Sequence, residues 1–157
     1  MRDATCREHR RALHTRPHAL AYNGPGSPFP CRSIVMAKAY LWINAVLYVV
    51  LAIWCTLSPS KTATAVGYTQ LSPAGQSEYL VIYGGLQLGM AFLFGYFAWI
   101  DQPRTGLLVA LAFYVPIVLF RTVSLSRLWP VSAPTVALAG VEILLLLAAV
   151  LLWFKHR

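Results

Sequence analysis

The sequence predicts an all-α protein, folded as a four-transmembrane-helix antiparallel bundle. The chain is 58% hydrophobic and only 11% charged, whereas soluble domains carry about 25% charged residues. In addition, four apolar stretches each reach the length of about 20 residues that a helix needs to cross a bilayer. Lipid offers no hydrogen-bond partners to the backbone, so such stretches are expected to be helical.

The predicted helices span residues 39–57, 79–100, 106–125 and 131–154. Short connections at 101–105 and 126–130 make the second, third and fourth helices antiparallel neighbours. The connection at 58–77 is longer. Within it, residues 61–66 are expected to form one short interfacial helix, and Ser77 is expected to cap the second span.

Residues 1–35 differ in composition from residues 36–157, which are predicted to form the transmembrane domain. The first region is rich in Arg, His, Pro and Gly, and its prolines exclude a long helix. We expect a disordered tail, or an extension that precedes a natural start at Met36. A transit peptide, and a cleaved signal with its cleavage site at 63–65, are the alternatives.

The net charge of the chain is +8, but residues 36–157 hold 7 basic and 3 acidic residues, which give a net charge of only +4. The rest of the positive charge lies in the first region. No basic face is interleaved with stacking aromatic residues outside the spans, so nucleic acid is not an expected partner.

One side of the predicted bundle carries Lys38, Arg104, Lys155 and Arg157, and the other carries Lys61 and Arg127. The positive-inside rule therefore predicts that both termini are cytoplasmic.

Three ionisable residues lie in or at the edge of the apolar stretches: Glu78, Arg121 and Glu142. Such groups cost about 2.5–3.5 kcal/mol each on insertion scales, so they are usually paired or functional. The antiparallel order places all three in the non-cytoplasmic half, and the guanidinium fork of arginine can serve two carboxylates. We therefore predict a Glu78–Arg121–Glu142 cluster. It is either a clamp that holds the helices in register or a half-buried pocket for a polar head group, a proton or a small cation.

Six polar side chains are predicted to line such a pocket: Tyr83, Gln87, Tyr114, Thr135, Asn44 and Tyr48. Gly85 and Gly89 lie four residues apart and are predicted to let another helix approach closely. No catalytic residue, metal-ligand set or cofactor site is predicted. The three cysteines form no CxxC pair, and no base is visible beside Cys55.

Several short motifs resemble one bacterial family: Leu57-Ser58-Pro59, Gly67-Tyr68, Ser77-Glu78-Tyr79, and the YGGLQLG run at 83–89, followed by an Arg near the end of the third span and a Glu inside the fourth. The family is the four-helix membrane proteins of domain of unknown function 4345, which look distantly similar to DoxX-like proteins. The resemblance covers about residues 37–155. It implies a bacterial inner-membrane bundle with Glu78, Arg121 and Glu142 at family-pattern positions, and it implies no activity. The DoxX-like link would suggest an accessory subunit in redox or thiol-stress systems.

The sequence thus favours a non-catalytic or accessory membrane component over an enzyme. Its expected partners are the lipid bilayer and either a second copy of the chain or a larger membrane complex. A small oligomeric transporter, or a proton- or cation-coupled carrier, is the alternative, although the first span lacks the acid that four-helix multidrug exporters use. A quinone- or thiol-linked membrane redox component is the second alternative.

Overall fold

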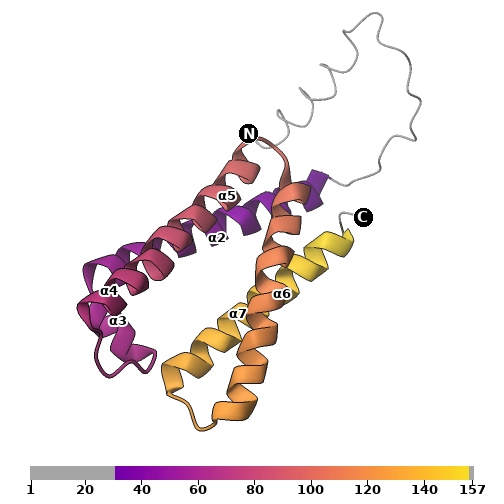
Figure 1. Ribbon diagram of the computed structural model, residues 1–157. Coiled ribbons are helices and arrows are strands. Elements are labelled where there is room, and N and C mark those ends of the chain that lie inside the picture. Colours follow the sequence, from indigo (N-terminus) through magenta and orange to yellow (C-terminus); the bar gives the residue numbers. More distant parts are fainter. Residues whose placement is uncertain (1–30, 156–157) are drawn as a thin grey trace, which may run out of the picture.

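The computed structural model describes residues 31–155, and every regular element in this part of the chain is helical (Figure 1). The elements are α2 (Cys31–Leu57), α3 (Pro59–Ala65), α4 (Pro73–Leu80), the π-helical turn η1 (Val81–Leu86), α5 (Gln87–Trp99), α6 (Pro103–Leu128) and α7 (Ala133–Lys155). Because α4, η1 and α5 follow one another without a break, they act as one long helix. The predicted all-α fold class is confirmed.

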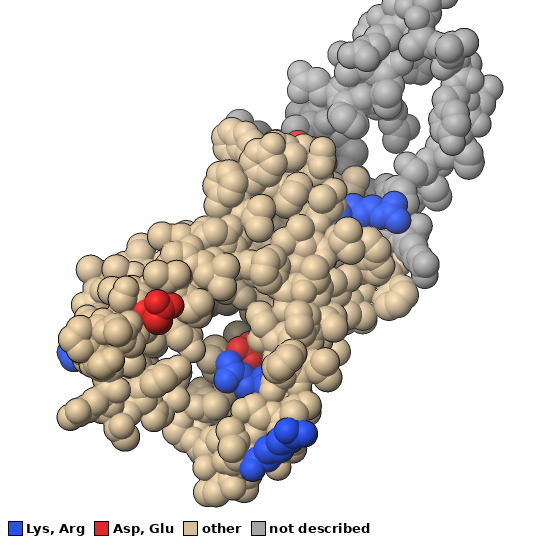
Figure 2. All heavy atoms as spheres, viewed as in Figure 1, with Lys and Arg blue, Asp and Glu red and all other residues tan. Residues whose placement is uncertain are grey.

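Four helical stretches in the described part are long and apolar enough to cross a membrane. They are Ser33–Leu57, Pro73–Trp99, Pro103–Leu128 and Ala133–Lys155. Charged side chains are sparse on the face of the molecule in Figure 2, as expected for helices that face lipid. The chain is therefore a small integral membrane protein that crosses the bilayer more than once.

The helices pack as two antiparallel pairs, with α2 along α5 and α6 along α7 (Figure 1). The turn between α5 and α6 is tight, and its Asp101 takes a left-handed backbone conformation with φ of 58°, which a short polar side chain tolerates. Lys38 Nζ lies 2.7 Å from Asp101 Oδ1, and the Arg104 guanidinium lies 5.5 Å from the centre of the Trp153 ring. The start of α2, the α5–α6 turn and the end of α7 thus share one end of the molecule, called here the Asp101 end.

The main hydrophobic core lies toward the Asp101 end, and all four spans contribute to it. Leu41, Phe94 and Leu107 are completely buried there. A Cβ atom at Gly106 would lie 2.5 Å from a methyl carbon of Leu41 and 3.1 Å from Phe97 Cβ, so a larger residue would displace the Leu41 side chain. This half of the bundle is tightly packed.

The opposite end, called here the α3 end, holds a smaller core of Cys55, Ala63 and Tyr79. Ser132, in the α6–α7 turn, lies close to α3, with its Oγ 3.4 Å from the carbonyl oxygen of Ala65. Figure 2 shows a hollow between the α3–α4 region and α6, with a basic and an acidic side chain on its wall. The bundle is therefore closed toward the Asp101 end and opens toward the α3 end.

Several predicted boundaries were wrong. The second span begins at Pro73, not at residue 79, because Ser72 caps it: the Ser72 Oγ accepts a hydrogen bond of 3.1 Å from the Gly75 amide. Ser77, the predicted cap, lies inside α4.

The helix α2, which contains the first span, begins at Cys31, so the predicted boundary at residue 36 falls inside a helix. The remainder of the predicted N-terminal region, residues 1–30, lies outside the described residues. The predicted short helix at 61–66 is present as α3, Pro59–Ala65.

Candidate functional site

Arg121 of α6 and Glu142 of α7 form an ion pair across the interface between the two helices. Arg121 Nε donates to Glu142 Oε2 at 2.9 Å, and Arg121 Nη2 donates to Glu142 Oε1 at 2.8 Å. At 1.5 Å per residue, Arg121 lies about 10 Å from the end of α6 and Glu142 lies about 14 Å from the start of α7. Because the helices are antiparallel and joined by a short turn, the two side chains reach similar depths.

The ion pair is only partly open to its surroundings. The exposed fraction of the side chain is 30% for Arg121 and 13% for Glu142. Two parallel charge-assisted hydrogen bonds add geometric specificity to the attraction between the charges. The pair has no net charge, so its simplest chemical role is to hold α6 and α7 at one relative register.

A buried polar group lies on the α2 side of the ion pair. Tyr114 donates a hydrogen bond of 2.6 Å to Asn44 Oδ1, and Asn44 Nδ2 donates one of 2.8 Å to the carbonyl oxygen of Tyr40. Tyr48 and Tyr114 both lie within electrostatic range of Glu142. Of the predicted lining residues, Asn44 and Tyr114 are thus buried in the interior, and Tyr48 is partly buried.

Two further predicted lining residues lie on the η1–α5 side. Tyr83 is partly buried and lies within electrostatic range of Arg121. The side-chain oxygen Oε1 of Gln87 is buried, and no hydrogen-bond donor reaches it from the described residues. Since Tyr83 and Gln87 are four residues apart, they lie on the same side of their helix.

Glu78 does not join the ion pair. It is exposed on α4, and within residues 31–155 it makes no ion pair or hydrogen bond. The residue of α4 that turns inward is its neighbour Tyr79, which is buried and whose hydroxyl lies 3.7 Å from Cys55 Sγ. Consecutive helical residues point about 100° apart, so Glu78 faces elsewhere. The predicted three-residue cluster, with its net charge of −1, is therefore a neutral pair in this structure.

Thr135 lies in the first turn of α7, where its hydroxyl oxygen is 2.9 Å from that of Ser132. Its side chain therefore contacts Ser132 at the N-terminal end of α7, about two turns away from Glu142.

The close approach between helices involves other glycines than the predicted ones. A Cβ atom added to Gly85 or Gly89 would meet nothing within 4 Å, so these two residues do not pack against another helix within residues 31–155. At Gly84 the added atom would lie 2.9 Å from Thr56 Oγ1 of α2. Among the glycines of the described residues, Gly84 and Gly106 are thus the ones with the tightest contacts to another helix. One indication in the sequence that Gly84 could allow a close helix contact is that it directly precedes Gly85 in the YGGLQLG run at 83–89.

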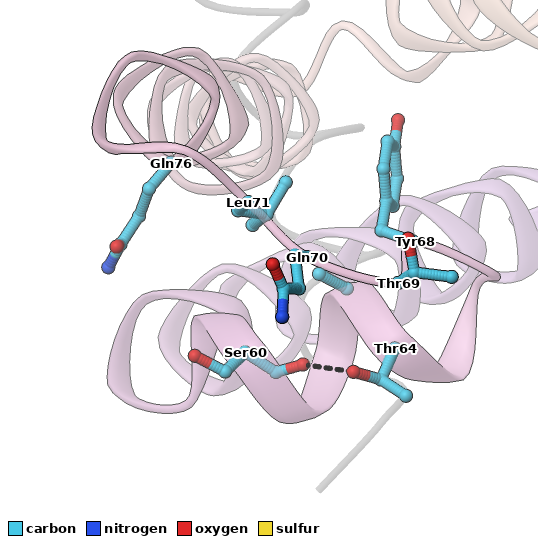
Figure 3. Close-up of a pocket in the computed structure, with 8 residues that line it drawn as sticks. Ser60, Thr64, Tyr68, Thr69, Gln70, Leu71 and Gln76 are labelled. Atoms are coloured by element: carbon cyan, nitrogen blue, oxygen red, sulfur yellow. Dashed lines mark hydrogen bonds between the residues drawn. The ribbon is translucent and has the colours of Figure 1, made fainter.

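A polar recess lies beside α3, between this helix and the segment that leads to α4 (Figure 3). Ser60, Thr64, Gln70 and Gln76 line it, and the Thr64 hydroxyl donates to the carbonyl oxygen of Ser60 at 2.8 Å. Within the described residues, no group of three or more His, Cys, Asp or Glu side chains gathers there or elsewhere in a way that could hold a metal ion.

Comparison of the chain with protein-family models, curated proteins and solved structures gave no match. The resemblance of about residues 37–155 to family 4345 therefore stays a prediction. The candidate site is argued from the geometry of this chain alone.

Proposed function

We propose that this chain is a non-catalytic, accessory component of a membrane, in which the Arg121–Glu142 ion pair clamps α6 to α7. The observation that supports this most directly is the bidentate geometry of the pair. Each charge satisfies the other through two hydrogen bonds of 2.8–2.9 Å. Both carboxylate oxygens of Glu142 thus accept a hydrogen bond from Arg121. The carrier alternative depended on a three-residue cluster with a net negative charge, whereas the Arg121–Glu142 pair is neutral.

A membrane component without chemistry of its own acts through its contacts, and α7 offers the largest free surface for them. It is the least buried of the four spans in the described residues. Leu144, Leu147 and Leu151 lie along one side of it and are each more than half exposed. We propose that this side of α7 contacts a helix of a second copy or of a larger membrane complex.

Site-specific photo-cross-linking tests the proposed contact. A photoreactive residue at Leu144 should yield a cross-linked protein product in native membranes. The same residue at Ile53, which is about half exposed on α2, serves as the control and should label lipid only. Equal cross-linking from both positions, or lipid products from both, would remove α7 as the contact surface.

A complementation experiment tests the non-catalytic role. In a strain that lacks the protein, the double variant Arg121→Leu, Glu142→Leu should restore the phenotype as well as the native chain does, provided that it folds. A double variant that accumulates and inserts normally but does not restore the phenotype would show that the pair has a role besides the clamp.

The location in the bacterial inner membrane, with both termini cytoplasmic, is part of the same proposal. Its support is the asymmetry of Lys and Arg between the two ends of the bundle. Lys38, Arg104 and Lys155 all belong to the Asp101 end. The α3 end would then face away from the cytoplasm.

A further inference from the structure

A pocket at the α3 end is lined by three tyrosines and one carboxylate. Tyr68, Tyr79, Tyr83 and Glu78 form it together with the aliphatic side chains of Leu71 and Ile82. Its volume is about 330 Å³, which is near the lower limit of the range of about 300–1,000 Å³ found for ligand sites. The pocket therefore suits a small head group.

The tyrosine rings come from two separate segments and pack on one another. The Tyr79 and Tyr83 rings stack, with their centroids 4.4 Å apart. The Tyr68 ring meets the Tyr79 ring edge-on, with a distance of 6.2 Å between the centroids and an angle of 85° between the ring planes. Tyr79 is fixed against α2 through Cys55. Tyr68 comes from the α3–α4 connection, and Figure 3 shows its ring pointing away from the polar side chains of α3. Tyrosines that only anchored the helices to the interface would extend separately toward the lipid head groups.

The electrostatic character of the pocket is negative. Glu78 is exposed and makes no ion pair within the described residues, so its carboxylate charge is uncompensated. The faces of aromatic rings also carry negative potential. Arg121 lies within electrostatic range of Tyr83, and Glu142 neutralises its charge. A ligand in this pocket would thus meet aromatic side chains and one free negative charge.

We propose that the Tyr68–Tyr79–Tyr83–Glu78 pocket binds an organic ammonium group. Aromatic rings arranged around a cavity attract such cations through their faces, and quaternary ammonium groups above all. A carboxylate at the rim adds a Coulomb attraction that a neutral ligand would not feel. The ammonium group belongs either to a small soluble amine or to the head group of a lipid, since both present the same cation to the pocket.

The binding of choline to the full chain tests the proposal. The protein is purified in a detergent with an uncharged sugar head group, and binding is followed by ligand-observed nuclear magnetic resonance. The neutral isostere of choline, 3,3-dimethylbutanol, serves as the reference ligand. We expect choline to bind and the isostere to bind more weakly. Equal binding of both would show that no cation is recognised and would overturn the proposal.

Variants of the pocket locate the site. Tyr68→Leu should raise the dissociation constant of choline about 3- to 30-fold, whereas Tyr68→Phe should keep it within about twofold because the ring face remains. Glu78→Gln should weaken binding about threefold and reduce its dependence on salt. The control is Tyr96→Leu, because Tyr96 has the same exposed fraction as Tyr68, 46%, and lies on α5 outside this pocket. Unchanged binding in both Tyr68→Leu and Glu78→Gln would overturn the assignment.

Bilayer nanodiscs distinguish the two sources of the ammonium group. A lipid site predicts that the native chain retains phosphatidylcholine or phosphatidylethanolamine over phosphatidylglycerol in native mass spectrometry, and that Glu78→Gln reduces the preference. A site for soluble amines predicts choline binding without a lipid preference. If neither choline nor ammonium lipids bind selectively, the pocket is not an ammonium site. Glu78 and Tyr68 are both exposed, so Glu78→Gln and Tyr68→Phe keep the test valid even if a larger change disturbs folding.

Discussion

Replacing Arg121 by leucine removes the group that donates both hydrogen bonds to the Glu142 carboxylate. Breaking a buried ion pair by removing one partner costs about 3–5 kcal/mol. Arg121 keeps 30% of its side chain exposed, so partial solvation lowers the cost, and we expect a loss near the lower limit, about 3 kcal/mol. A loss of that size reduces the ratio of folded to unfolded protein about a hundredfold.

The double variant Arg121→Leu, Glu142→Leu separates the ion pair from simple damage to the helix interface. Replacing both partners by apolar residues is often neutral or even stabilising. We therefore expect the double variant to lose less than about half of what Arg121→Leu alone loses. Arg127→Leu is the control. Arg127 is exposed in the last turn of the same helix and makes no ion pair within residues 31–155, so its loss should cost less than about 1 kcal/mol.

Reversible unfolding in mixed micelles measures these free energies. The fraction of sodium dodecyl sulfate is raised stepwise, and helix content and tryptophan fluorescence report the folded fraction. Two results would refute the reasoning. One is an Arg121→Leu variant as stable as the native chain. The other is a double variant whose loss equals the sum of the two single losses, which would mean that the charges are not coupled.

Three further predictions follow from the packing and the topology. Tyr114→Phe should destabilise the fold by about 1–3 kcal/mol in the same unfolding assay, because it leaves the buried Oδ1 of Asn44 without its donor. Gly106→Ala should lower the folded yield, whereas Gly85→Ala should preserve or raise it, since an added Cβ has open space only at the second position; equal yields would contradict the packing described for α2 and α6. A reporter fused after Asp101 should show a cytoplasmic location, and a non-cytoplasmic signal would overturn the proposed orientation.

The four spans could be predicted from the sequence because the requirement for apolar length and internal hydrogen bonding in lipid is strong. Their ends could not be predicted as well. The first turns of α4 contain polar residues, so hydropathy placed the start of the second span too late, while the cap at Ser72 and Pro73 extends the helix. Both Ser72 and Ser77 precede the apolar stretch, and the sequence alone does not show which of them adopts the extended backbone of a helix cap.

Side-chain contacts between different helices were harder to predict than the helices themselves. Arg121 and Glu142 lie on helices joined by a short turn, so their similar depth followed from counting residues. Whether Glu78 reaches them depends on the rotation of α4 about its axis, which the contact of Tyr79 with Cys55 and the π-helical turn η1 determine. The contact of Tyr68 with Tyr79 could not be predicted from the sequence, for a different reason. Tyr68 belongs to an irregular connection, whose path no periodic pattern describes.

The charge-swapped variant Arg121→Glu, Glu142→Arg tests the central claim most directly. Each single reversal places two like charges side by side in a partly buried position, and both should reduce the folded yield in membranes strongly. If the two residues act on each other as a clamp, the swapped pair should restore the folded yield well above that of either single reversal. A swapped variant that accumulates no better than the single reversals would contradict the account.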